Sequence, residues 1–154
     1  MTVLIKFLLI CLLFWGALMV LSYIRLSKVD QTIWHLDPDA INYNYEKNSI
    51  LLNYANNGQE NFDIDVNSLF NHLNKIIIND KCKKVFGGIN FGLITYECRS
   101  KVFGFPDYVS ISFKEFMIDK SAISIFSRSR FGKRDFGKNK QRIQKWVTEL
   151  KKSI

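Results

Sequence analysis

The chain has 154 residues, of which 47% are hydrophobic and 14% aromatic. This length matches one domain, and the apolar share is enough to build a core, which excludes a disordered chain. The formal net charge of +8 is uneven: residues 98–154 hold 14 Lys/Arg and 5 Asp/Glu, whereas residues 25–97 hold 7 and 9. The basic character therefore belongs to the C-terminal third, and its distribution, more than the total charge, indicates possible partners.

Residues 1–24 are predicted to form an uncleaved transmembrane signal anchor. Residues 7–21 contain no polar side chain, and a helix from residue 2 to 24 is long enough to cross about 30 Å of hydrocarbon. A cleaved signal peptide is the alternative, but no small-x-small site follows, and Ile10 before Cys11 disfavours lipoprotein processing. Positive charges flank the segment equally, so the short N-terminal tail alone favours a domain outside the cytoplasm, on the inner membrane.

The next segments are predicted from composition and period. Residues 25–47 are polar with scattered aromatic side chains, which is typical of a juxtamembrane linker to a domain over residues 48–154. A short strand is expected over residues 49–54, followed by a turn or loop over residues 55–61. Asp65 then suits the N-cap of an amphipathic helix. Its core-facing residues are Val66, Leu69, Phe70, Leu73 and Ile77.

Four strand-like segments follow, over residues 81–88, 91–100, 108–116 and 121–130. Their short connections favour antiparallel neighbours in a meander. A final helix places Ile143, Trp146, Val147 and Leu150 on one face. The order β-α-β-β-β-β-α predicts an α+β fold, with an antiparallel sheet and two helices packed on one face. The other face must be solvated, or covered by a ligand, a partner or a membrane surface.

Two cysteines outside the anchor could form a disulfide. If the segment GGINFG turns a hairpin centred on Asn90, Cys82 lies opposite Cys98. Directly opposed strand residues are about 4.5–5.5 Å apart, within reach of a disulfide. Two half-buried free thiols are the alternative interpretation, and a thiol count distinguishes the two.

The last third carries a dense pattern of arginine, glycine and aspartate. Its residues are Tyr96, Arg99, Ser100, Gly104, Phe105, Pro106, Asp107, Tyr108, Ser110, Arg128, Ser129, Arg130, Gly132, Asp135, Gly137, Asn139, Arg142 and Trp146. This pattern resembles the domain-of-unknown-function 1499 family, and the sequence WHLDP over residues 34–38 is similar to the segment after the anchor in bacterial members. The resemblance implies a small, often membrane-anchored bacterial domain of the cell envelope, without an established activity.

The residues themselves suggest an anion-binding corner. Strand alternation places Arg128 and Arg130 side by side on one face, and Arg99 ends a neighbouring strand. Asn139 and Arg142 follow at the start of the last helix, where free N–H groups attract anions and Asp135 can cap. The predicted ligand-binding residues are Arg99, Arg128, Arg130, Asp135, Asn139 and Arg142. The expected ligand is a carboxylate, phosphate or sulfate, carried by an anionic lipid, a glycan or an acidic protein.

Other interpretations of the same residues remain open. Asp107 and Asp135 could instead pair with the arginines in a purely structural network. They could also serve as acid and base of a hydrolase-like enzyme, although nearby arginines would keep both ionised. No metal-ligand spacing and no cofactor motif is present in the sequence. Nucleic acid is not an expected partner, because the exposed strand residues are Ser and Arg rather than stacking aromatics.

Overall fold

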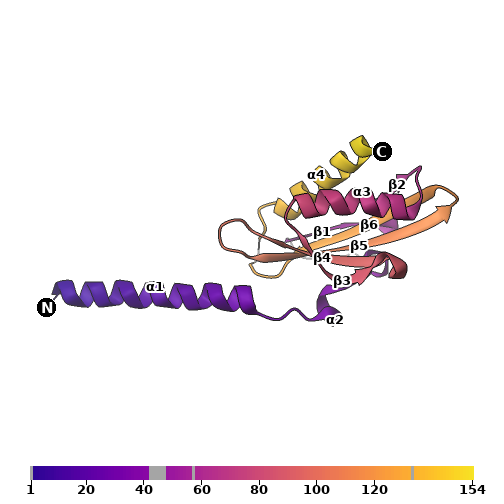
Figure 1. The fold of residues 1–154 in the computed structure, drawn as a ribbon. Helices are drawn as coiled ribbons and strands as arrows, with labels where there is room; N and C mark the ends of the chain where they lie inside the picture. The colour runs from indigo at the N-terminus through magenta and orange to yellow at the C-terminus, as the bar shows by residue number, and fades with distance from the viewer. Residues whose placement is uncertain (1, 42–47, 57, 133) are drawn as a thin grey trace.

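The structure, a computed structural model, describes residues 2–41, 48–56, 58–132 and 134–154. A long N-terminal helix, α1 (Thr2–Leu26), projects away from an α+β domain (Figure 1). Short helical turns α2 (Gln31–Trp34) and η1 (Pro38–Ala40) follow it. The other elements are β1 (Ser49–Leu52), η2 (Tyr54–Asn56), β2 (Glu60–Phe62), α3 (Val66–Asn79), β3 (Lys83–Gly88), η3 (Ile89–Phe91), β4 (Leu93–Arg99), β5 (Pro106–Met117), β6 (Lys120–Ser129) and α4 (Lys138–Ser153).

The six strands form one antiparallel sheet in the order β1-β6-β5-β4-β3, with β2 also paired to β6. The predicted α+β class and the meander of the last four strands are confirmed. The prediction of a loop over residues 55–61 was wrong at its end, because Glu60–Phe62 pairs with Ser121–Ile123. A strand of three residues is too short to show the alternation of polar and apolar residues by which strands are recognised.

Both long helices of the domain cover the same face of the sheet (Figure 1). Asp65 caps α3 by accepting hydrogen bonds from the backbone N–H groups of residues 67 and 68. The apolar stripes of α3 and α4 enclose a core together with strand residues such as Ile94, Val109 and Ile125. The fully buried apolar residues of these two helices are Leu69, Leu73, Ile77, Ile143, Trp146 and Leu150. The helical periods therefore predicted the core correctly, because each stripe meets the same sheet face.

A disulfide joins the start of the β3–β4 hairpin to the end of β4. Cys82 and Cys98 are bonded, with Cα atoms 4.3 Å apart, and both are buried. The pairing Lys83↔Glu97 places the two cysteines directly across from each other, as the hairpin centred near Asn90 predicts. The register shifts by one residue only between Lys84 and Phe86, nearer the turn, so the shift leaves the cysteine pair aligned.

The second face of the sheet is covered by the segment that follows α1. The Trp34 ring packs 4.6 Å from the ring of Tyr108, and Ser110 donates a hydrogen bond to the Trp34 carbonyl oxygen. His35 Nδ1 lies 2.8 Å from Thr95 Oγ1, which in turn lies 2.9 Å from Ser110 Oγ. Burial lowers the pKa of His35, so the ring is neutral at this position at pH 7.

Farther along the same face, Asn53 donates to the Pro38 carbonyl oxygen at 2.9 Å, and Lys114 pairs with Asp39 at 2.6 Å. Ser112 also donates to Asp39. This face is rich in serine and threonine, which the sequence pattern does not distinguish from a solvated surface. Residues 30–41 bond to the hydroxyls of Thr95, Ser110 and Ser112 and exclude solvent from them, whereas residues 42–47 of the expected linker lie outside the described part.

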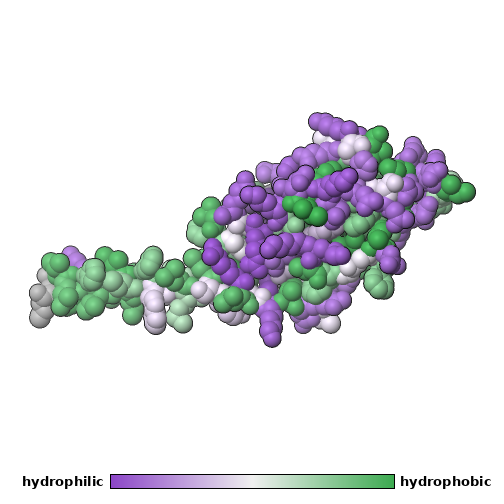
Figure 2. All heavy atoms as spheres, in the orientation of Figure 1, coloured by the Kyte–Doolittle hydropathy of each residue, from purple (hydrophilic) through white to green (hydrophobic). Residues whose placement is uncertain are grey.

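Helix α1 is long and apolar enough to cross a membrane, and its most apolar stretch is not covered by the domain. Figure 2 shows an almost continuous apolar surface along this helix and a mainly hydrophilic surface on the domain. A signal sequence near an N-terminus meets the same criteria of length and composition. Ile24, in the last turn of α1, is nevertheless buried, so the domain begins to pack on the chain before the helix ends.

Candidate functional site

Strand β6 divides the predicted ligand-binding residues between two faces of the sheet. Ile125 lies in the core beneath the helices, and Ser127 donates a hydrogen bond to Asn139 of α4. The set of alternate strand residues that includes 125 and 127 therefore faces the helices. Arg128 and Arg130 belong to the other set and contact the segment after α1. The structure therefore does not gather all six predicted residues in one corner, because side chains of adjacent strand residues point to opposite faces.

On the helix face, Asn139 is the centre of a buried hydrogen-bond network, which we call the Asn139 network. Its side-chain oxygen accepts hydrogen bonds from Ser127 Oγ at 2.7 Å and from Arg142 Nη1 at 2.9 Å. Its side-chain nitrogen donates to the Asn48 carbonyl oxygen and to Ser129 Oγ, both at 3.1 Å. All four hydrogen-bonding positions of a carboxamide are thus used inside the protein, which makes Asn139 a structural residue.

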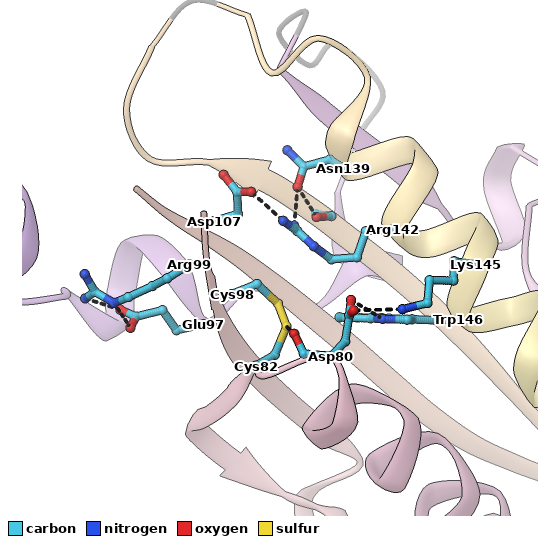
Figure 3. Close-up of a disulfide and its surroundings, with 11 residues drawn as sticks. Asp80, Cys82, Glu97, Cys98, Arg99, Asp107, Asn139, Arg142, Lys145 and Trp146 are labelled. Atoms are coloured by element: carbon cyan, nitrogen blue, oxygen red, sulfur yellow. Dashed lines mark hydrogen bonds and ion pairs between the residues drawn. A yellow bond between two sulfur atoms is a disulfide. The ribbon is translucent and has the colours of Figure 1, made fainter. Parts of the chain in front are cut away.

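Arg142 connects this network to β5. Its Nη2 donates to Asp107 Oδ2 at 2.8 Å, and the two side chains are only 14% and 12% exposed. Figure 3 shows Arg142 reaching from α4 between Asn139 and Asp107. Arg142 thus donates hydrogen bonds to two internal partners, as the hypothesis of a structural network expects for an arginine of the motif.

Asp135 has a different task from Asp107. Its two carboxylate oxygens accept hydrogen bonds from the backbone N–H groups of Gly137 at 3.0 Å and Asn139 at 2.9 Å. These contacts hold the first turn of α4, and Gly137 adopts a positive φ of 76° just before the helix. As the sequence predicts, Asp135 caps the helix start. The two carboxylates of the hydrolase hypothesis are thus engaged with different structural partners.

The other face carries the arginine cluster, which we define as Arg99, Arg128 and Arg130. Arg99 donates two hydrogen bonds to the Glu97 carboxylate, from Nε at 2.7 Å and from Nη2 at 3.1 Å. Glu97 also accepts a hydrogen bond from the Tyr108 hydroxyl at 2.9 Å, and Arg130 lies 3.4 Å from that hydroxyl. A continuous polar chain therefore links Arg99 at the end of β4 to Arg130 just after β6, through Tyr108 of β5.

Tyr108 stays protonated in the middle of this chain. Burial raises the pKa of Tyr108, the hydrogen bond from Arg130 opposes the rise, and the hydrogen bond to Glu97 adds to it. A protonated hydroxyl can donate to Glu97 while accepting from Arg130, which is the arrangement observed. The ring of Tyr108 meanwhile packs on Trp34 of the segment after α1.

Two arginines of the cluster hold the segment after α1. Arg130 donates to the backbone carbonyl oxygens of Ser27 at 3.1 Å and Lys28 at 2.8 Å. Arg128 donates to the carbonyl oxygen of Ile33, and its guanidinium lies 4.5 Å from the centre of the Trp34 ring. Carbonyl binding thus places the Arg130 charge where the chain leaves α1, and carbonyl binding with a cation–π contact places the Arg128 charge on α2.

Further basic residues surround the same place. Arg25 and Lys28 are exposed, and Lys101 is exposed on the loop that follows Arg99. Glu97 and Asp30 are nearby acids, and Asp30 caps α2 through Thr32. The hydrogen bonds of Asp30 to Thr32 lower its pKa, so it is ionised there at neutral pH. The exit of α1 is therefore predominantly positive.

Several residues of these two sites were not selected from the sequence. Glu97 and Ser127 have no spacing that singles them out, and Tyr108 was noticed only as part of the family pattern. Asn48 contributes a backbone carbonyl, which leaves no signal in a sequence. Trp34 was noticed only as part of the WHLDP segment. Among the described residues, no group of three His, Cys, Asp or Glu side chains is arranged to hold a metal ion.

Fold and site together define a class: a small α+β domain clamped by arginines to the end of a long apolar N-terminal helix. The chain belongs to the DUF1499 family, described as a protein of unknown function, whose model matches residues 38–150. This match covers both the Asn139 network and the arginine cluster. No curated protein matches the chain.

Proposed function

We propose that the protein is a single-pass, membrane-anchored module of the cell envelope that binds an anionic ligand or an acidic partner at the arginine cluster. The observation that carries the proposal is the contact of Arg130 with the carbonyl oxygens of Ser27 and Lys28. It holds the Arg130 guanidinium beside the exit of α1, with Arg99 connected to it through Glu97 and Tyr108. Arginine suits this role because its planar, permanently charged group binds phosphates and carboxylates through paired hydrogen bonds.

An uncleaved anchor is favoured by the contacts at the end of α1. Ile24 is buried, and Ser27 and Lys28 are bonded to the domain. Cleavage near the end of the apolar stretch would remove or free these residues. An anchor therefore accounts for packing that a transient signal sequence does not require.

A position outside the cytoplasm is favoured by the disulfide between Cys82 and Cys98. Structural disulfides form and persist mainly in oxidising compartments. An alkaline phosphatase fusion at the C-terminus, which needs its own disulfides, should be active in cells. A green fluorescent protein fusion at the same point should be dark when exported through the general secretion route. The reverse pattern would contradict the proposed side of the membrane.

Two features leave the arginine cluster able to meet a ligand. The Arg99 side chain is 35% exposed, and Arg25 and Lys28 are exposed beside it. Of the six residues first expected to bind a ligand, Asn139 is fully buried and the Arg142 side chain is only 14% exposed. Asp135 caps α4. The proposed site therefore comprises Arg99, Arg128 and Arg130, with Arg25 and Lys28 at its margin.

Binding can be tested with heparin as an anionic probe. The full chain would be placed in nanodiscs of phosphatidylcholine, which carry no net charge, and eluted from heparin resin with salt. A variant with Arg99→Gln and Lys28→Gln should elute at clearly lower salt. The matched control is Lys140→Gln with Lys152→Gln, which removes the same charge from exposed positions on α4. Equal elution of the two variants would reject a local site and leave only general charge.

A further inference from the structure

We propose that two loops beside the end of α1 insert apolar side chains into the lipid interface of the leaflet that α1 enters. The loops are residues 100–105, between β4 and β5, and the described residues of the β6–α4 connection. This inference rests on the membrane anchor of the proposed function, and it names the lipid surface as a partner. It concerns different residues from the arginine cluster and can fail independently of it.

The tips of these loops expose large apolar side chains. Val102 is 75% exposed, Phe103 is 52% exposed and Phe136 is 83% exposed. Phe136 also has a positive φ of 54°, an unusual backbone conformation for a bulky residue. Its phenyl ring is thus directed out of the protein at a position where the backbone is strained, and strain of this kind often marks a functional site.

The two loops are joined to each other by aromatic contacts. The ring of Phe105 lies 5.8 Å from that of Phe103 in its own loop and 6.5 Å from that of Phe131 in the other. Arg130, one residue earlier, stacks 5.3 Å from the Phe131 ring. Aromatic contacts therefore join the two loops next to the arginine cluster. These contacts keep both loops at the same end of the sheet.

That end is the one from which α1 leaves (Figure 1). Gly104 has a positive φ of 71°, and a Cβ atom there would lie 3.1 Å from Arg25 Nε in the last turn of α1. The loop and the end of the helix are thus in close contact. If α1 crosses a bilayer, the tip at residues 102 and 103 lies at the depth where the chain leaves the hydrocarbon.

The charges around the tips match an anionic lipid surface. Lys101 precedes Val102, Arg25 touches the loop at Gly104, and Arg134 lies two residues before Phe136. Apolar side chains flanked by basic ones are typical of segments that lie in the membrane interface. Each basic residue near an anionic bilayer adds to the attraction.

The opposite end of the sheet provides an internal comparison. The β5–β6 hairpin also exposes apolar residues, including Ile118 at 89%. Since β5 has twelve residues, this tip lies about 40 Å from the loops beside α1. The charges beside it are of both signs, with Glu115 and Asp119 next to Lys114 and Lys120. A lipid surface that α1 enters can therefore contact residues 100–105 and the β6–α4 connection, but not the β5–β6 hairpin.

The test uses the full chain with Cys11→Ser and one new cysteine, either Val102→Cys or, as the matched control, Ile118→Cys. Each is labelled with an environment-sensitive fluorophore in nanodiscs of phosphatidylcholine and phosphatidylglycerol in equal amounts. Spin-labelled lipid and aqueous iodide serve as quenchers, and a thiol count verifies that the disulfide is intact. We expect the label at 102 to be quenched by the lipid and protected from iodide, with the opposite result at 118.

Equal iodide quenching at both positions would overturn the inference, even if heparin binding depends on Arg99 and Lys28. Lipid quenching at 102 combined with heparin elution that is unaffected by those two substitutions would support the inference and reject only the anion site. A second variant, Val102→Asp with Phe103→Asp, should shorten the reach of the loop into lipid. In this double variant, a label at Phe136→Cys should lose at least half of its lipid quenching. Unchanged quenching would count against a joint insertion of both loops.

Discussion

The guanidinium of Arg130 donates a hydrogen bond to the carbonyl oxygen of Lys28, 102 residues earlier in the chain. A second bond from the same side chain reaches Ser27. These contacts join the last strand of the sheet to the first residues after α1, so the domain is held against its own N-terminal helix. The arrangement fixes which end of the sheet faces the helix.

Replacing Arg130 with Met should free the segment after α1 while keeping an apolar stem of similar length. Hydrogen bonds from a charged group contribute about 1.5–3 kcal/mol each at most, and part of this is lost to solvent competition at a half-buried site. We expect faster amide hydrogen exchange over residues 27–35 and a free energy of unfolding lower by about 1–3 kcal/mol. The exposed Arg134→Met is the control, and equal exchange in both variants would contradict the clamp.

Breaking the ion pair between Arg142 and Asp107 should strongly destabilise the domain. Both side chains are largely buried, so removing one partner leaves the other charge without compensation. For Arg142→Met we expect a loss of about 3–5 kcal/mol of unfolding free energy, measured by urea denaturation in detergent. The double variant with Asp107→Leu should recover part of this loss. A double variant as unstable as the sum of both single changes would show that the pair is not coupled.

Replacing Asn139 with Leu tests the network around it. The change leaves the Asn48 carbonyl and the hydroxyls of Ser127 and Ser129 without their partner. We expect a loss of about 2–4 kcal/mol, since each unsatisfied buried group costs about 1–3 kcal/mol and water relieves some of them. The measurement is the thermal unfolding midpoint, with the neighbouring exposed Lys140→Leu as control. A midpoint equal to that of the control would contradict the structural role.

Removing the disulfide should lower stability without changing the fold. Cys82 and Cys98 are separated by 16 positions, and closing a loop of this size contributes about 3 kcal/mol in chain-entropy terms. The double variant with both cysteines changed to Ser should unfold at lower urea, whereas Cys11→Ser should not. A count of one free thiol in the denatured, non-reduced protein is expected, and three would show that the bond does not form in cells.

Asp80 makes part of the stability dependent on acid pH. It accepts hydrogen bonds from Lys145 Nζ at 2.8 Å and Trp146 Nε1 at 3.0 Å, which join the end of α3 to α4 (Figure 3). Burial acts to raise the pKa of Asp80, but the bonds from Lys145 and Trp146 outweigh burial and lower the pKa below 3.8. As the pH falls, Asp80 therefore binds a proton in the unfolded chain before it does so in the folded protein.

The stabilisation by Asp80 is consequently complete well above pH 3.8 and is lost as the pH falls through the lower pKa of the folded state. In Asp80→Asn this component is absent, so the free energy of unfolding should be lower at pH 7 and should decrease less between pH 5 and pH 3. Asp119→Asn, at an exposed hairpin turn, is the control. Parallel pH profiles for the Asp80 variant and the unchanged chain would contradict the assignment.

Much of the fold could be predicted because it depends on local periods. The stripe Leu69, Leu73 and Ile77 identified α3, and the alternation in β6 correctly separated Arg128 and Arg130 from Ser127. Symmetry about one turn residue was sufficient to place Cys82 opposite Cys98. Such features depend on spacing within one or two neighbouring elements, and side-chain direction follows spacing directly.

The sequence by itself thus determined the α+β class, the apolar helix at the N-terminus, the helix faces and the family resemblance. Only the tertiary structure decided that the polar second face of the sheet is covered by residues 30–41, and that the basic corner consists of two separate sites. Several partners there are backbone carbonyl oxygens from distant parts of the chain, such as those of Lys28 and Asn48, about a hundred residues away. Every residue carries a carbonyl oxygen, so no side-chain pattern indicates which ones an arginine or an asparagine will bind.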